Sequence, residues 1–190
     1  MLAGNTYRSV VGVALATAFL LLIPLLAMQV TDEVVWDLAD FAFAGALIFG
    51  TGLTFVLVAR KAGNIAYRFA VGVALAAAFI LVWLSLGVGV IGADGDPANL
   101  MYFGVLAVGI IGALLARFRS HGMARALFAM ALAQALVAAI ALIARLGLPW
   151  SGPAELLALN GFFVALFVGS ALLFRHAGRG RTPAGAGQEG

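Results

Sequence analysis

Long apolar runs alternate with short polar turns along the whole chain. We predict membrane-spanning helices at residues 10–30, 38–59, 70–91, 100–116, 124–143 and 154–174. Each run holds about 17 to 22 residues, which at about 1.5 Å per residue matches the hydrocarbon core of a bilayer. The pattern therefore predicts an all-α integral membrane protein with six transmembrane helices. Pro24 lies inside the first run and predicts a kink or an interruption of the helix there.

These runs pair into three tandem hairpins. The segment YRSVVGVALATAFLL at 7–21 closely matches YRFAVGVALAAAFIL at 67–81, with Tyr7 in the place of Tyr67, and the third copy is looser. Each hairpin enters and leaves on one side, so the copies share an orientation and are expected to relate by an axis along the membrane normal. We predict a parallel pseudo-threefold arrangement of three repeats, at 7–63, 66–119 and 123–176.

The loops differ in charge according to the side on which they lie. All lysines and arginines except Arg145 fall on one side, and all acidic residues except Glu189 fall on the other. The positive-inside rule then places both termini in the cytoplasm. We expect residues 1–176 to form a single six-helix transmembrane domain, followed by a disordered cytoplasmic tail at 177–190, in a bacterial inner membrane.

Composition excludes several classes of function. Hydrophobic residues make up 64% of the chain and charged residues 10%, whereas a soluble domain carries roughly 25% charged residues. There is no cysteine, so disulfides, thiolate metal sites and cysteine nucleophiles are excluded. The net charge of +3 comes from basic residues at the ends of apolar runs, which does not indicate nucleic-acid binding.

The turns on the acidic side align across the three copies and offer the first candidate chemistry. They read Asp37-Leu-Ala-Asp40, Asp96-Pro-Ala-Asn99 and Gly152-Pro-Ala-Glu155. One interpretation is helix capping, with Asp37 or Asp96 as N-cap and proline at the first helical position. The other is a ring of Asp40, Asn99 and Glu155 around a central cavity that takes a cation or an amine. Both interpretations can hold together.

Few polar residues lie inside the apolar runs. Gln134 is near the middle of the fifth run, and Asn160 is about a turn and a half into the sixth. Amides in lipid usually pair across helices, although a ligand contact is the alternative. Arg145 is expected to reach the interface or to pair with Glu155 across the hairpin.

Glycines suggest how the spans pack. The stretch Gly87-Val-Gly89-Val-Ile-Gly92 has the spacing of a dinucleotide fingerprint, but it lacks the strand that this motif requires, so we interpret these glycines as sites of close helix packing. Further glycines, at 45, 50, 104, 109, 161 and 169, predict that the even-numbered spans are inner helices and that the odd-numbered spans face lipid more.

Two functions remain open from the sequence. The first, weakly favoured, is a transport or small-ligand-binding membrane protein. The second is a non-catalytic structural or accessory subunit of a membrane complex. No catalytic, metal-binding or cofactor-binding constellation is found, so no enzyme activity or cofactor is expected. The expected partners are the lipid bilayer and either a partner membrane subunit or further copies of the chain, without nucleic acid.

Overall fold

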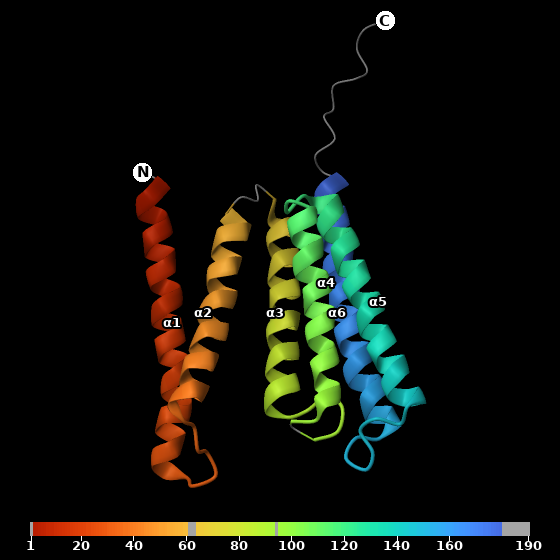
Figure 1. The fold of residues 1–190 in the computed structure, drawn as a ribbon. Coiled ribbons are helices and arrows are strands. Elements are labelled where there is room, and N and C mark those ends of the chain that lie inside the picture. The colour runs from red at the N-terminus through yellow and green to blue at the C-terminus, as the bar shows by residue number, and fades with distance from the viewer. Residues whose placement is uncertain (1, 61–63, 94, 180–190) are drawn as a thin grey trace, which may run out of the picture. The chain divides into compact units, whose positions relative to one another are not determined.

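The computed structural model describes residues 2–60, 64–93 and 95–179, with side-chain surroundings described from residue 6 onward (Figure 1). Contacts between Cα atoms divide the chain into two compact units, Met1–Lys61 and Ala62–Gly190. We call them unit 1 and unit 2 and describe each by itself. That all six helices form a single domain stays a prediction.

The regular secondary structure of the described residues is entirely helical, with no strand. The α-helices are α1 (Leu2–Val30), α2 (Leu38–Arg60), α3 (Ile65–Gly87), α4 (Met101–Leu115), α5 (Ser120–Ile143) and α6 (Pro153–Arg179), and a short 3-10 helix, η1 (Pro97–Leu100), precedes α4. Six helical segments are long and apolar enough to cross a membrane, η1 and α4 together forming one of them. The prediction of an all-helical chain with six helices long and apolar enough to span a membrane is confirmed for the described residues, and it suggests a polytopic membrane protein. Helix α1 runs through Pro24 without ending there.

Unit 1 is a single hairpin of α1 and α2. At the end where α1 begins and α2 ends, the guanidinium of Arg60 donates hydrogen bonds to the hydroxyls of Thr6 and Ser9, the latter at 2.6 Å. Farther along, a Cβ added to Gly52 would lie 2.8 Å from a methyl of Val13, so the glycine lets the two helices approach closely.

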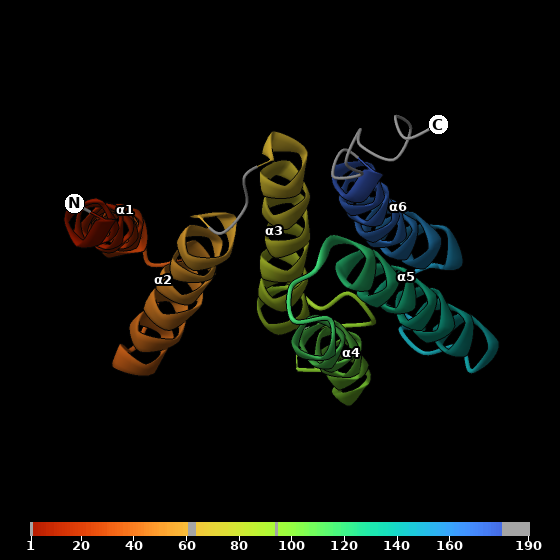
Figure 2. The ribbon, with the colours of Figure 1, turned by 90° about the horizontal axis from the view of Figure 1, so that it is seen from above.

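Unit 2 is an antiparallel bundle of α3, α4, α5 and α6, and Figure 2 shows its helices from above. Helix α5 packs against both α4 and α6, and α3 packs mainly against α6. The hydroxyl of Ser170 on α6 donates to the Ala70 carbonyl on α3 (2.7 Å), and the rings of Tyr67 and Phe174 meet edge to face at 4.9 Å. We call the end that carries the start of α5 and the end of α6 the basic end, and the opposite end the acidic end.

The expectation that even-numbered spans are the inner helices is wrong for α4 and α5, although α6 is more buried than α3. Within an 18-residue apolar stretch of each span, 44% of the residues are buried in α5, but only 17% are buried in the span formed by η1 and α4. Helix α5 is buried because it lies between two neighbours, and its inward face is built largely from alanines such as Ala131, Ala138 and Ala141. Alanine allows close helix approach as glycine does, so glycine content alone did not identify the inner helix.

Only some of the glycines occupy helix contacts. On α4, a Cβ at Gly109 would overlap Met130 and one at Gly112 would lie 2.6 Å from the Ala126 Cβ, so these two allow α4 to approach α5. Gly104 on the same helix faces open space, as do the glycines at 50, 161 and 169.

The glycines at 87–92 form a turn and do not pack helices together, contrary to the sequence interpretation. Helix α3 ends at Gly87, whereas the sequence predicted an end near 91. Gly89 and Gly92 have φ values of +82° and +70°, which favour glycine because a Cβ is strained there. At the other end of the unit, α6 continues to Arg179, whereas the sequence predicted a helix to 174 and a tail from 177, and the rest of that tail, 180–190, lies outside the described residues.

Candidate functional site

The turn before α2 is a complete helix cap. Asp37 is the N-cap: its carboxylate accepts from the backbone N–H of Asp40 at 2.9 Å, and the Asp40 carboxylate accepts from the N–H of Asp37 at the same distance. Trp36 precedes the cap and packs edge to face on Phe41, with ring centroids 5.3 Å apart. This combination of capping box and hydrophobic staple fixes the start of α2. Asp40 is exposed and has a capping role here.

Asn99 is tied into the loop that precedes its helix. Its side-chain oxygen accepts from the N–H groups of Val90 and Ile91, both at 2.9 Å, and its amide nitrogen donates to the carbonyls of Ile91 and Ala93. Asn99 is only 4% exposed, and Val90 and Ile91 are buried beside it. The side chain thus replaces the backbone partners that the loop lacks after α3 ends. The neighbouring cap is as predicted, with Asp96 accepting from the N–H of Ala98 (2.8 Å).

A second loop locks onto the first at the acidic end. The hydroxyl of Ser151, in the turn between α5 and α6, accepts from the N–H of Gly92 at 3.1 Å. Gly147 has a φ of +97°, and a Cβ built on it would lie 3.1 Å from the Gly92 nitrogen. The two turns approach so closely that only glycine fits at this point, so the loops joining α3 to α4 and α5 to α6 form one packed junction.

A buried polar cluster joins three helices in the interior of unit 2. The side-chain oxygen of Asn160 on α6 accepts from the hydroxyl of Tyr102 on α4 (3.1 Å) and from the amide of Gln134 on α5 (2.9 Å). The Asn160 amide nitrogen donates to the carbonyl of Leu156, one turn earlier (2.9 Å). All three side chains of the cluster are at most 1% exposed. We call Tyr102, Gln134 and Asn160 the core cluster.

The core cluster leaves one polar atom without a partner. The side-chain oxygen of Gln134 is buried and accepts no hydrogen bond from the described residues. The hydroxyl of Ser85 on α3 is likewise buried without a hydrogen-bond partner among them. Rotating the Gln134 amide would direct its oxygen at the Asn160 oxygen, an acceptor facing an acceptor. The observed orientation of the amide is therefore the one that the cluster favours.

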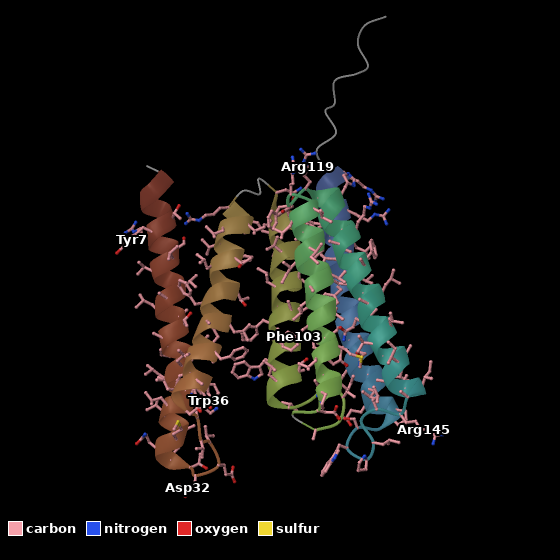
Figure 3. All side chains as sticks on the ribbon, in the orientation of Figure 1. Tyr7, Asp32, Trp36, Phe103, Arg119 and Arg145 are labelled. Carbon is pink, nitrogen blue, oxygen red and sulfur yellow. The ribbon has the colours of Figure 1, made fainter. Side chains whose placement is uncertain are left out.

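Glu155 and Arg145 are both exposed at the acidic end. Glu155 lies in the first turn of α6, where the positive end of the helix dipole stabilises a carboxylate. Arg145 follows the end of α5 with a φ of +54°, and Figure 3 shows its side chain pointing away from the bundle. In the described structure no ion pair joins Arg145 to Glu155.

Of the residues singled out from the sequence, the structure brings together Gln134 and Asn160. Asn99 is engaged within its own loop, and Glu155 and Arg145 make no bond to either amide. Sequence reasoning missed Tyr102 and Ser151. The signal for Tyr102 was weak, because a tyrosine near the start of a span is also typical of the membrane interface. For Ser151, only its place in a turn that also contains Gly147 and Gly152 could have drawn attention.

The comparisons with known proteins return no match. No family model, no curated protein and no solved structure matches this chain. The described residues also contain no group of three or more histidine or acidic side chains able to hold a metal ion. The assignment of a function therefore depends on the geometry of the chain itself.

Proposed function

We propose that the chain is a non-catalytic structural or accessory subunit of a membrane complex, with unit 2 as a closed, internally bonded body. The observation that carries this proposal is the core cluster. A transport path along the bundle would need Gln134 and Asn160 to face a cavity, yet both are fully buried and are bonded to each other and to Tyr102. Three of the four helices of unit 2 meet at this cluster, which favours a bundle that stays closed.

The acidic end supports the same proposal. A polar ring would need Asn99 to turn its amide toward an axis, but that amide is used in four hydrogen bonds to its own loop. The junction of Ser151 with Gly92 closes this end of unit 2 further. Transport or ligand binding through the interior of unit 2, the function weakly favoured by the sequence, is therefore the second candidate.

Orientation, location and partners remain proposals based on the sequence. The charge asymmetry of the loops supports cytoplasmic termini in a bacterial inner membrane. The sequence matches between hairpins support a parallel, pseudo-threefold relation among the repeats. The proposed partners are the lipid bilayer and a second membrane subunit or further copies of this chain. Extraction into polymer nanodiscs followed by mass measurement tests this, because a single chain alone would argue against a subunit.

The absence of native cysteine allows a direct test of the closed interior. Ala131→Cys and Ala138→Cys, made singly, flank Gln134 on the buried face of α5. Ala135→Cys lies on the exposed face at the same depth, and Ala144→Cys lies beyond the end of α5. A charged methanethiosulfonate reagent reacts with the thiolate and needs water around it.

In intact membranes and spheroplasts we expect labelling only at position 144. The buried positions are protected by the bundle, and position 135 is protected by lipid. Labelling at 131 or 138, without labelling at 135, would reveal an aqueous path through unit 2 and favour transport. Because labelling accumulates over minutes, it also reports conformations that open only part of the time.

A further inference from the structure

A cavity of about 730 Å³ opens at the basic end of unit 2, a site that the proposed function does not use. It lies where α4 ends and α5 begins, beside the end of α6. Figure 3 shows Arg119 at this end of the bundle. The volume of the cavity falls within the range of roughly 300–1,000 Å³ typical of small-molecule sites. The lining residues that matter here are Arg117, Arg119, Ser120, His121, Gly122 and Gly178.

The first turn of α5 forms one wall of this cavity. Ser120, His121 and Gly122 are the first three residues of the helix. The hydrogen bonds of the helix backbone begin only at Met123, whose N–H donates to the Arg119 carbonyl (2.8 Å). The first turn contains no acidic residue, and the N-cap residue Arg119 provides no side-chain cap. The unpaired N–H groups and the helix dipole together favour an anion at this position.

A serine side chain in the wall of the cavity gives an independent indication of a ligand. Ser120 is only 7% exposed as a residue and lines the cavity, and its hydroxyl makes no side-chain hydrogen bond within the described part of the chain. This hydroxyl is therefore available to a molecule in the cavity. The guanidinium groups of Arg117 and Arg119 likewise have no carboxylate partner among the described residues. The cavity therefore brings together several hydrogen-bond donors without acceptors.

The turn that carries these donors is held in place before any ligand arrives. Arg117 and Phe118 both have left-handed backbone conformations, with φ of +47° and +58°, which are unfavourable for residues other than glycine. The carbonyl of Phe118 accepts a hydrogen bond of 2.6 Å from the hydroxyl of the buried Tyr67 on α3. This bond fixes the turn against the bundle, and with it the backbone positions of the two arginines that line the cavity.

We propose that this cavity binds a phosphate group. Arginine forks, a serine hydroxyl and the N–H groups of a helix start match the several oxygens of a phosphate better than they match a halide or a cation. The cavity lies at the end of an apolar bundle, where phosphates come from two sources. One is the headgroup of an anionic phospholipid, and the other is a soluble phosphate compound. The donors are the same for both.

Binding to the full chain tests the proposal with each source in turn. Radiolabelled inorganic phosphate is equilibrated with the chain in phosphatidylcholine nanodiscs. Separately, phosphatidylglycerol is titrated into the detergent-solubilised chain and the bound species are counted by native mass spectrometry. Arg119→Gln and Ser120→Ala remove donors, and Arg125→Gln is the matched control because it is an exposed arginine on the same helix outside the cavity lining.

We expect Arg119→Gln to weaken binding roughly tenfold or more, since a charged hydrogen bond is lost, and Ser120→Ala to weaken it by a smaller factor. Arg125→Gln should leave the dissociation constant within about twofold. An effect in both arms identifies a site open to soluble phosphates, and an effect with phosphatidylglycerol alone identifies a lipid headgroup site. The proposal is overturned if neither probe binds, or if Arg119→Gln and Arg125→Gln weaken binding equally, because the attraction would then be diffuse. Helix content by circular dichroism verifies that each variant is folded.

Discussion

Asn160 is expected to stabilise unit 2 through two hydrogen bonds between helices, and this can be measured. Its side-chain oxygen accepts from Tyr102 and from Gln134, at 3.1 and 2.9 Å. Asn160→Leu keeps the approximate shape of the side chain but leaves both donors unpaired in a dry interior. Polar pairs between membrane helices contribute about 0.6 kcal/mol on average and about 1.7 kcal/mol at most. We therefore expect a loss of about 1–3 kcal/mol in the free energy of unfolding.

The single bonds can be separated by milder changes. Tyr102→Phe removes one donor without opening a cavity and should cost about 0.5–1 kcal/mol. Gln134→Leu removes one bond but also removes a buried oxygen that has no partner, so its net effect should be smaller than that of Asn160→Leu. This ordering follows from the bonding pattern, because all three side chains are equally buried.

A double-mutant cycle of Tyr102→Phe with Asn160→Leu isolates the coupling. Once Asn160 is replaced, the hydroxyl of Tyr102 has lost its acceptor, so removing it should cost nothing or stabilise slightly. Unfolding by sodium dodecyl sulfate in mixed micelles, followed by circular dichroism, gives the four free energies. We expect a coupling energy of about 0.6 kcal/mol or more. Additivity within about 0.3 kcal/mol would refute the argument that this bond joins α4 to α6.

Four further results are expected. Asn99→Ala should lower the unfolding free energy by about 2–4 kcal/mol because two buried N–H groups lose their acceptor, whereas Asn99→Asp keeps the acceptor and should cost clearly less in the same titration. Gly112→Ala should cost about 1–3 kcal/mol through overlap with the facing alanine on α5, while Gly104→Ala on the same helix faces open space and should be neutral or slightly stabilising; equal effects would contradict the packing of α4 on α5. Pro153→Ala should be mild because this proline is the first residue of α6, whereas Ala165→Pro, inside the helix, should cost about 3 kcal/mol or more. A C-terminal alkaline phosphatase fusion should be inactive and a fluorescent protein fusion bright, and the reverse result would invert the proposed topology.

The helices could be predicted from the sequence because local signals mark their ends. Asp37 and Asp96 cap the helices that follow them, and Pro153 begins α6, as the turn chemistry indicated. The predicted end of α3 was less accurate. Residues 88–91 continue the apolar run, but they form a loop in which Val90 and Ile91 are buried and donate their backbone N–H groups to Asn99. Hydropathy cannot distinguish a buried apolar loop from the last turn of a helix.

The candidate sites were less predictable because they depend on contacts between distant segments. Gln134 and Asn160 were recognised separately as polar residues in apolar spans, yet nothing in the sequence indicated that both would meet Tyr102. The cavity at the basic end requires the α4–α5 turn, with its two left-handed residues, to be fixed by Tyr67. Such contacts depend on how the helices pack, and no single segment encodes them.

The internal repeat shows how far local similarity determines environment. Tyr7 and Tyr67 occupy equivalent places in nearly identical segments, and both segments are helical. Tyr67 is nevertheless buried and bonded to Phe118 in unit 2, whereas Tyr7 is 72% exposed. A helix needs only its own sequence and an apolar surrounding, whereas a buried hydroxyl needs an acceptor on a neighbouring element. Among the described residues of unit 1, none accepts a hydrogen bond from the hydroxyl of Tyr7, so the same tyrosine has no such partner there. Sequence equivalence between the hairpins therefore predicts equivalent helices but not equivalent sites. This is also why Asp40, Asn99 and Glu155, aligned in the sequence, serve as a reciprocal cap, a loop anchor and an exposed first-turn carboxylate.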